Sequence, residues 1–245
     1  MRTYGLIGFP LSHSFSQKYF SDKFKKENIT DCEFKNFSLE SIDQLSQLLE
    51  QTPTLCGLSV TIPHKKSVMR LLNDMDSTAK KIGAVNCIRI QNKKLTGYNT
   101  DVHGFEQSLK PLLNKHHKQA LILGTGGASN AIAFCLNNLN IPYRFVSRKN
   151  ASSLPYSSLS KKIITESNLI VNTTPLGTFP NINDCPAIPY QYLTPQHLLY
   201  DLTYNPEETL FLKKGKEKGT AIKNGYEMLC LQAEKAWDIW NNGNT

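Results

Sequence analysis

Short apolar runs alternate with amphipathic segments along most of the chain, which is the pattern of an α/β protein. In the first part the pattern predicts strands over 4–9, 32–37 and 55–62, with helices over 16–26 and 41–50 between them. Ser41 is a suitable N-cap for the second helix. Pro63 is expected to open a further helix, because proline is favoured at the first helical position.

The pattern then changes to a hairpin and a second α/β segment. Residues 84–91 and 95–98 flank a polar turn, and Asp101 is placed to cap a helix over 102–109. The polar stretch 111–118 could be the linker to a second domain. Beyond it we expect strands over 119–123, 143–147, 169–172 and 198–202, a helix over 127–139 and a last helix over 224–241.

Composition narrows the class of protein. The 245 residues suffice for one large or two modest domains, and 40% apolar with 20% charged residues is ordinary for a soluble globular protein. No apolar stretch approaches the roughly 20 residues of a membrane span, and no signal peptide is evident, so we expect a cytoplasmic protein that does not bind membranes. Six scattered cysteines without a C-x-x-C motif predict reduced, mostly buried thiols and no metal site.

The formal charge of +8 could indicate nucleic-acid binding, but the lysines are spread over helices and loops and form no aromatic-interleaved basic motif. A solvated basic surface is the simpler interpretation, and no nucleic-acid partner is expected. The positive electrostatic field of such a surface would also attract a small anionic substrate and a phosphate-rich cofactor.

A glycine turn, Gly124-Thr125-Gly126-Gly127, lies between an apolar strand and a helix with small residues. This context favours a dinucleotide, whose pyrophosphate would sit at the helix N-terminus, over a turn that is merely tight. About twenty residues later the next strand ends in Ser147-Arg148-Lys149, where NAD-binding proteins place an acid. A guanidinium there suits the 2′-phosphate of NADP, although Arg148 could also be an ordinary surface residue.

Two residues are candidates for proton transfer. Lys65 falls in the first turn of a helix, where the dipole opposes a cation and favours the neutral amine, and Asp101 follows the end of a strand. Taken alone, Lys65 would be an exposed lysine and Asp101 a helix cap. Ser14 and Ser16 could cradle a carboxylate. Gln232 is the one polar member of an apolar helical stripe, so it needs a partner, which could be a ligand hydroxyl, a water or a backbone group.

These residues stand in motifs that resemble the shikimate dehydrogenase family in order along nearly the whole chain. The matching segments are H-S-x-S at 13–16, V-T-x-P-x-K at 60–65, G-A-V-N at 83–86, G-x-N-T-D-x-x-G at 97–104, G-x-G-G-x-x-x-A at 124–131, N-T-T-P-L-G at 172–177, D-x-x-Y-N-P-x-x-T at 201–209 and G-x-x-M-L-x-x-Q at 225–232.

The resemblance implies NADPH-dependent, reversible reduction of 3-dehydroshikimate to shikimate, a step of aromatic amino-acid biosynthesis. It implies that Lys65 exchanges the proton and that Asp101 holds this lysine and a substrate hydroxyl. Ser14, Ser16 and Tyr204 would bind the substrate carboxylate, and Thr61, Asn86, Asp101 and Gln232 its ring hydroxyls. The residues expected at the cofactor are Gly124, Thr125, Gly126, Gly127, Ala128, Ser147, Arg148, Thr173, Leu202 and Gly225.

The resemblance also implies two α/β domains. We expect a substrate-binding and catalytic domain over 1–101 and a Rossmann-type NADP-binding domain over 102–220, with the C-terminal helix (221–245) returning to the first domain, in a monomer or homodimer. The chain departs from the family in three places. Ser147-Arg148-Lys149 replaces a usual Asn-Arg-Thr, residues 150–167 look short for a helix and a strand, and Cys87 replaces a threonine.

Two rival functions stay open. A quinate/shikimate dehydrogenase with relaxed substrate or NAD use is disfavoured by Ser14, Ser16 and Arg148. A catalytically silent ligand sensor is disfavoured by the presence of both Lys65 and Asp101.

Overall fold

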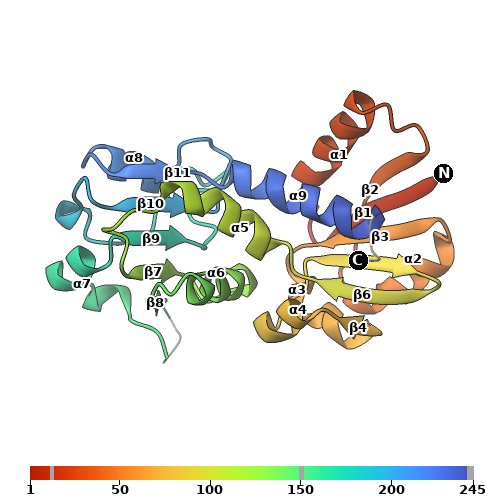
Figure 1. Ribbon diagram of the computed structural model, residues 1–245, viewed down its shortest axis with the longest axis horizontal. Helices are drawn as coiled ribbons and strands as arrows, with labels where there is room; N and C mark the ends of the chain where they lie inside the picture. The colour runs from red at the N-terminus through yellow and green to blue at the C-terminus, as the bar shows by residue number, and fades with distance from the viewer. Residues whose placement is uncertain (12–13, 149–151, 242–245) are drawn as a thin grey trace. The chain divides into compact units, whose positions relative to one another are not determined.

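The structure is a computed structural model that describes residues 1–11, 14–148 and 152–241, and the chain forms two compact units. Unit 1 consists of residues 1–100 together with the chain from Gln232 onward, and unit 2 consists of residues 101–231. The first boundary therefore falls one residue before the sequence-based one, and the segment 221–231 belongs to unit 2. Each unit is an α/β fold, as predicted, and the end of the last helix does belong to the first unit (Figure 1).

Unit 1 is built on a six-stranded mixed sheet in the order β2-β1-β3-β5-β6-β4. Its strands are β1 (Arg2–Gly8), β2 (Cys32–Ser38), β3 (Leu55–Val60), β4 (Asp74–Met75), β5 (Cys87–Gln91) and β6 (Lys94–Tyr98). β1, β2 and β3 are parallel, whereas β5 runs antiparallel to both β3 and β6. Consequently the carboxyl ends of β1, β3 and β6 share one edge of the sheet with the amino end of β5.

The hairpin between β5 and β6 is confirmed, with a tighter turn than the three polar residues indicated. Gln91 pairs with Lys94, which leaves Asn92 and Lys93 as a two-residue loop. Both have positive φ, 50° and 63°, as a type I′ turn requires. A lysine rarely adopts this conformation, so the turn carries backbone strain.

The helices of unit 1 include all the predicted segments, with one change of type. They are α1 (Phe15–Lys26), η1 (Ile42–Gln44), α2 (Leu45–Gln51), α3 (His64–Ser67), η2 (Val68–Leu71), α4 (Ser77–Ile82) and the C-terminal part of α9 (Tyr226–Asn241). Of these, η2 and α4 were not predicted. The segment predicted as one helix over 41–50 starts with a 3₁₀ turn, which a capping box between Ser41 and Gln44 closes. Pro63 is the N-cap of α3.

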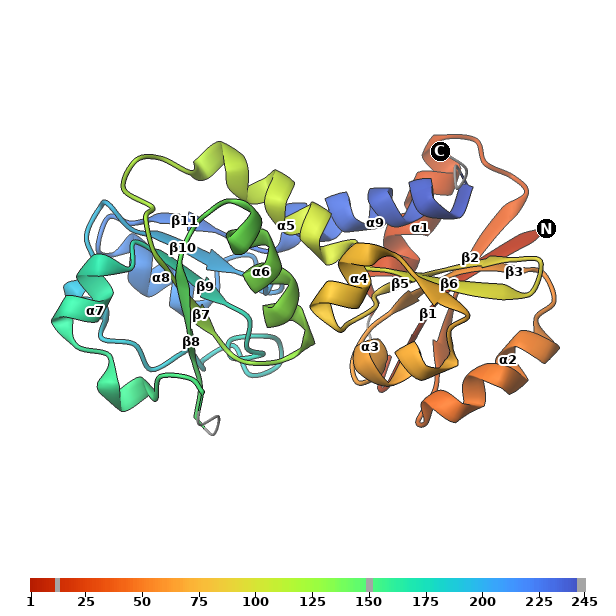
Figure 2. The ribbon, with the colours of Figure 1, turned by 60° about the horizontal axis from the view of Figure 1, so that its bottom comes forward.

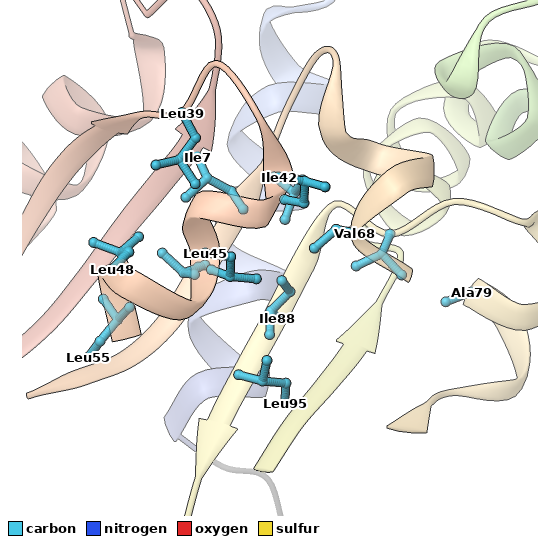
Figure 3. Close-up of a cluster of buried hydrophobic side chains, with 13 residues drawn as sticks. Ile7, Leu39, Ile42, Leu45, Leu48, Leu55, Val68, Ala79, Ile88 and Leu95 are labelled. Atoms are coloured by element: carbon cyan, nitrogen blue, oxygen red, sulfur yellow. The ribbon is translucent and has the colours of Figure 1, made fainter. Parts of the chain in front are cut away.

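Helices cover both faces of the unit 1 sheet (Figures 1 and 2). On one face, leucines and isoleucines of η1 and α2 pack on Ile7, Leu55 and Ile88 (Figure 3). On the other face, α1 and α9 enclose an aromatic cluster in which Tyr4 stacks on Trp240 with ring centroids 5.1 Å apart. Because side chains alternate along a strand, Tyr4 and Ile7 of β1 face opposite layers.

Unit 2 has a five-stranded parallel sheet in the order β11-β10-β9-β7-β8. Its strands are β7 (Ala120–Leu123), β8 (Tyr143–Val146), β9 (Leu169–Asn172), β10 (Leu198–Asp201) and β11 (Ala221–Lys223). Its helices are α5 (Asp101–Leu109), η3 (Lys110–Leu112), α6 (Gly127–Asn138), η4 (Tyr156–Ser158), α7 (Lys161–Glu166), η5 (Tyr190–Tyr192), α8 (Leu210–Lys216) and the start of α9. α6 lies on one side of the sheet and α7 and α8 lie on the other (Figure 2).

The strand order identifies where a nucleotide can bind in unit 2. The chain moves from β7 to one side, to β8, and then crosses back to β9 on the other side, which makes the edge between β7 and β9 the topological switch point. A six-stranded Rossmann sheet has the order 3-2-1-4-5-6. This sheet matches that order without its third strand, because the described residues between β8 and β9 form only a bridge at Leu154, η4 and α7.

Candidate active site

Two predicted substrate residues lie at the shared edge of the unit 1 sheet. The Thr61 backbone N–H donates to Ile7 O at 2.9 Å, which ties the end of β3 to the end of β1. Asn86 bridges the next two strand ends, because its carbonyl accepts from Val60 N at 2.8 Å and its N–H donates to Tyr98 O at 3.1 Å. Backbone bonds therefore fix both residues at one edge.

Lys65 is attached to the same edge through its own main chain. The His64 N–H donates to Thr61 O at 2.9 Å, and Lys65 O accepts from Val85 N at 2.8 Å. The half-buried lysine thus lies beside the segment that carries Asn86. The helix that holds it, α3, has only four residues. The dipole argument made from the sequence therefore loses most of its force, and the position of Lys65 rests on these backbone contacts.

Gln232 is brought to Asn86 by a buried network that includes Thr100. Asn86 Oδ1 accepts from Thr100 N at 2.7 Å, and Asn86 Nδ2 donates to Thr100 Oγ1 at 3.0 Å. Thr100 Oγ1 lies 3.3 Å from Gln232 Oε1. The side chains of Asn86 and Thr100 are therefore partners of Gln232, and no sequence motif had indicated this contact for Thr100.

Ser14 and Ser16 lie at the start of α1. Ser14 is the N-cap, with Oγ accepting from Gln17 N at 3.2 Å, and Ser16 is the second helical residue. In the parallel β1-α1-β2 crossover the helix runs against the strands, so its N-terminus returns to the carboxyl edge of the sheet. Both serines therefore belong to the edge that holds Thr61 and Lys65.

Asp101 and Tyr204 belong to unit 2. Asp101 is buried and is the first residue of α5 rather than a cap outside it. It directly follows Thr100, so the chain itself holds it next to the Asn86–Thr100–Gln232 network. Tyr204 is half-buried, and burial raises the pKa of its phenol. The phenol thus keeps the proton with which it can donate to a carboxylate.

The glycine turn of unit 2 has the geometry that a dinucleotide requires. Gly124 has φ = 110°, and a Cβ there would come within 2.7 Å of Thr173 Oγ1. Thr173 in turn bonds Leu123 through both its N–H and its hydroxyl, which places it beside the turn at the switch point. Gly126 is the N-cap of the twelve-residue α6, with no side-chain cap and open space where a Cβ would be. Backbone N–H groups at this helix start therefore fit a pyrophosphate.

The remaining predicted cofactor residues lie near the carboxyl ends of strands in the same parallel sheet. Ser147 follows β8 and bonds Ser153 through its hydroxyl at 2.7 Å, and Arg148 beside it is exposed, as a group that pairs with a phosphate should be. Lys149 lies outside the described residues. Leu202 follows β10, and Gly225 lies so close to it that a Cβ would meet Leu202 O at 2.1 Å. Thr125 is exposed in the turn and Ala128 is half-buried in the first turn of α6.

Asp201 is a buried acid at this edge that the sequence did not identify as a functional residue. Asp201 Oδ2 accepts from Thr209 Oγ1 at 2.6 Å, and its Oδ1 accepts from Thr203 N and Asn172 Nδ2, each at 3.0 Å. Burial nevertheless raises the pKa of Asp201 to about 6. The carboxyl group holds together the ends of β9 and β10 and the loop that carries Tyr204.

The cysteines are less buried than the sequence indicated. All six lie within the described ranges and are free thiols, but only Cys87 and Cys135 are buried, and Cys56 is half-buried. Burial raises the pKa of Cys87, so this residue stays a thiol of low reactivity where the family has a threonine. Within the described ranges we find neither a group of three or more metal-ligating side chains nor a helix suited to crossing a membrane.

Comparison with known proteins decides the family. Residues 6–88, which lie in unit 1, match the shikimate dehydrogenase substrate binding domain. A shikimate dehydrogenase (NADP(+)) of Desulforamulus reducens is 36% identical over 259 residues, which cover 96% of this chain and 88% of that protein. The chain belongs to the shikimate dehydrogenase family.

Solved structures of shikimate dehydrogenases share the whole fold. Shikimate dehydrogenase 1 of Peptoclostridium difficile superposes with a TM-score of 0.85 at 35% identity, covering 100% of this chain and 93% of that one. The enzyme of Thermus thermophilus, solved with NADP(H) and shikimate, gives a TM-score of 0.87 at 26% identity, with 99% and 94% covered.

Proposed function

We propose that this protein catalyses the NADP-dependent, reversible reduction of 3-dehydroshikimate to shikimate, with Lys65 and Asp101 as its catalytic pair. The observation that carries the reaction is the full-length relationship to enzymes named shikimate dehydrogenase (NADP(+)). The roles of individual residues are our proposal. They are supported by the residues that share the carboxyl edge of the unit 1 sheet and by the fit of the Gly124–Gly127 turn to a pyrophosphate.

Lys65 supplies the proton that the reaction consumes. When bound, NADPH provides a hydride for the C3 carbonyl carbon, and the carbonyl oxygen then gains negative charge. An ammonium group beside that oxygen stabilises the charge and passes a proton to it. In the oxidative direction the neutral amine removes the same proton. Asp101 orients the ammonium group and accepts from a substrate hydroxyl.

The other polar groups select the substrate. Ser14, Ser16 and Tyr204 offer hydroxyl donors to its carboxylate, and Thr61, Asn86 and Gln232 take its ring hydroxyls. A substrate that lacks one of these hydroxyls would leave a polar side chain without a partner, which is a strong basis for discrimination. On the cofactor side, backbone groups of Gly124, Thr125, Gly126, Gly127 and Ala128 hold the pyrophosphate, Ser147 and Arg148 the 2′-phosphate, and Thr173, Leu202 and Gly225 the nicotinamide end.

The test is the absorbance of reduced nicotinamide with purified protein, crossing shikimate or quinate with NADP or NAD. We expect turnover to be dominated by the shikimate–NADP pair. Comparable rates with quinate or NAD would move the protein to the broader quinate/shikimate class. No turnover from folded protein with any pair would contradict the enzyme and favour the ligand sensor.

Variants test the catalytic pair. Lys65→Ala and Asp101→Asn should each lower kcat by about 10²- to 10⁴-fold, the range for lost general acid–base catalysis. The matched control is Lys66→Ala, which removes the exposed neighbouring lysine of the same helix and should leave kcat unchanged. Equal losses in both lysine variants would contradict the role of Lys65.

A further inference from the structure

The loop that carries Tyr204 begins and ends at two side chains that bond to each other. Asp201 and Thr209 are both 0% exposed, and Thr209 Oγ1 donates to Asp201 Oδ2 at 2.6 Å. The second carboxylate oxygen, Oδ1, accepts from Thr203 N and from Asn172 Nδ2, each at 3.0 Å. Removing the carboxylate would take this partner from several donors in the interior, which is costly. The carboxylate therefore fixes the course of the loop around it.

The two carboxylate oxygens act on different parts of this loop. Oδ2 bonds the hydroxyl of Thr209, which is the N-cap of α8 and accepts from Leu212 N. Oδ1 bonds the N–H of Thr203, two residues along the chain, and so closes the turn that leads into Tyr204. Loss of the Oδ2 bond should therefore weaken the start of α8, whereas loss of the Oδ1 bond should release the turn before Tyr204.

Further hydrogen bonds join this turn to two other segments of unit 2. Thr203 O accepts from Gly225 N at 3.0 Å. The hydroxyl groups of Thr203 and Thr178 lie 3.0 Å apart, and either can be the donor. Burial raises the pKa of Asp201, and the hydrogen bond of the Thr203 hydroxyl opposes that rise. The backbone N–H, the carbonyl and the hydroxyl of Thr203 thus all contribute to holding the turn.

The main chain is fixed on both sides of Tyr204. Thr203 precedes it, and Asn205, which follows it, accepts through its backbone carbonyl from Phe179 N at 3.1 Å. We propose that Asp201 is a positioning residue that holds Tyr204 in place for the substrate carboxylate, acting through the N–H group of Thr203. A hydroxyl donor serves a carboxylate only at hydrogen-bond distance and in good alignment, so a fixed turn contributes to substrate affinity. This inference rests on the role that the proposed function gives Tyr204.

The variant Asp201→Ala tests this role. We expect the KM for shikimate to rise about tenfold, a factor equivalent to about 1.4 kcal/mol. The value of kcat should fall by less than about threefold, because Tyr204 acts on binding. Asp201→Asn should keep the KM within about twofold of the wild type. Its Oδ1 can still accept from Thr203 N, and its NH₂ can donate to Thr209 Oγ1.

Thr209→Val is the matched control for a purely structural effect. It removes the Oδ2 partner and the N-cap of α8, so the urea midpoint of unfolding should fall. It leaves the bond to Thr203 intact, so the KM for shikimate should stay within about twofold of the wild type. Unfolding of part of the sample lowers the apparent kcat but leaves the KM of the folded molecules unchanged. If Asp201→Ala does not fold, Asp201→Glu takes its place, because the added methylene keeps the charge and moves the oxygens away from the Thr203 N–H.

A double-mutant cycle shows whether Asp201 acts through Tyr204. The variant Tyr204→Phe removes the phenol hydroxyl. In that background Asp201→Ala should change the Kd for shikimate, measured by titration calorimetry, by less than about twofold, because the group it positions is gone. Far-UV circular dichroism checks the fold of each variant.

The outcomes separate this inference from the proposed function. A wild-type KM for shikimate in Asp201→Ala, an equal rise in Thr209→Val, or additive Kd effects in the cycle would overturn the role of Asp201 while leaving the enzyme intact. Wild-type protein that binds shikimate without turning it over would refute the proposed function, and the cycle of Kd values would still decide on Asp201. Wild-type protein that does not bind shikimate would overturn both.

Discussion

The buried carboxyl group of Asp201 should make unit 2 less stable as the pH rises. The side chain is fully buried and accepts hydrogen bonds from Thr209, Thr203 and Asn172. Three donors favour the charged form, but desolvation outweighs them and raises the pKa from 3.8 to about 6. The folded protein therefore binds this proton more tightly than the unfolded chain does.

The sign and size of the effect follow from proton linkage. A folded-state pKa above the unfolded value contributes stability that is complete below the unfolded pKa and is lost as the pH rises through about 6. A difference of about two units corresponds to about 3 kcal/mol in total. About half of it, about 1.4 kcal/mol, falls between pH 5 and pH 8, where other carboxyl groups contribute little.

Asp201→Asn isolates this contribution because asparagine has the same shape and does not titrate. Its Oδ1 can still accept from Thr203 N and Asn172 Nδ2, and its NH₂ can donate to Thr209 Oγ1. We expect the free energy of unfolding of the variant, relative to wild type, to increase by about 1.4 kcal/mol from pH 5 to pH 8. Urea unfolding followed by far-UV circular dichroism measures it, and Asp184→Asn, which removes an exposed carboxylate of unit 2, is the matched control.

A difference that stays constant over this range, or that decreases as the pH rises, would refute the reasoning. Both tryptophans, Trp237 and Trp240, lie in unit 1, so their fluorescence reports that unit. A pH-dependent difference seen only in tryptophan fluorescence would locate the effect outside unit 2 and would also count against Asp201.

Three further predictions concern packing, backbone strain and cofactor choice. Gly57→Ala should destabilise the protein by about 1–3 kcal/mol, because a Cβ there would lie 2.4 Å from the Trp240 ring; an unchanged urea midpoint would disprove the close packing. Lys93→Gly should stabilise it by about 1 kcal/mol by relieving a φ of 63°, with kcat unchanged. Arg148→Ala should raise the KM for NADP about tenfold and leave that for NAD unaltered, whereas Arg144→Ala, in the preceding strand β8, should affect neither.

The elements of unit 2 were the easier ones to predict from the sequence. β7 and β9 are fully buried, so they appear as continuous apolar runs, and the predicted strands agree with them within one residue. Short polar elements gave no such signal. β4 (Asp74–Met75) has two residues, and β11 is a three-residue strand at the edge of its sheet with no buried residue. Neither is long enough to show a pattern of polar and apolar positions that differs from that of a loop.

The motifs located the candidate site residues in the sequence, but they did not show which of these residues bond to one another. Thr100 stands next to Asp101 in a polar segment, and no periodicity marks it as buried. Its hydrogen bonds are to Asn86 and Gln232, which are 146 positions apart in the chain. Asp201 and Thr209 are the two ends of one motif, but the bond between their side chains depends on a loop whose course the spacing does not reveal.

The rule that ligands bind at the carboxyl ends of strands explains unit 2 directly, because all its strands are parallel. In unit 1 Thr61 follows the end of β3 and Thr100 follows β6, as the rule expects of site residues, but Asn86 precedes its strand. It reaches the same edge because β5 is antiparallel to both neighbours, which turns its amino end toward their carboxyl ends. The hairpin turn at Asn92 and Lys93 then reverses the chain again, so β6 ends at this edge and carries Thr100 there. The antiparallel pairing of β5 with β3 therefore places Asn86 at the edge where β3 and β6 end, and unit 1 brings residues of parallel and antiparallel strands together at that edge.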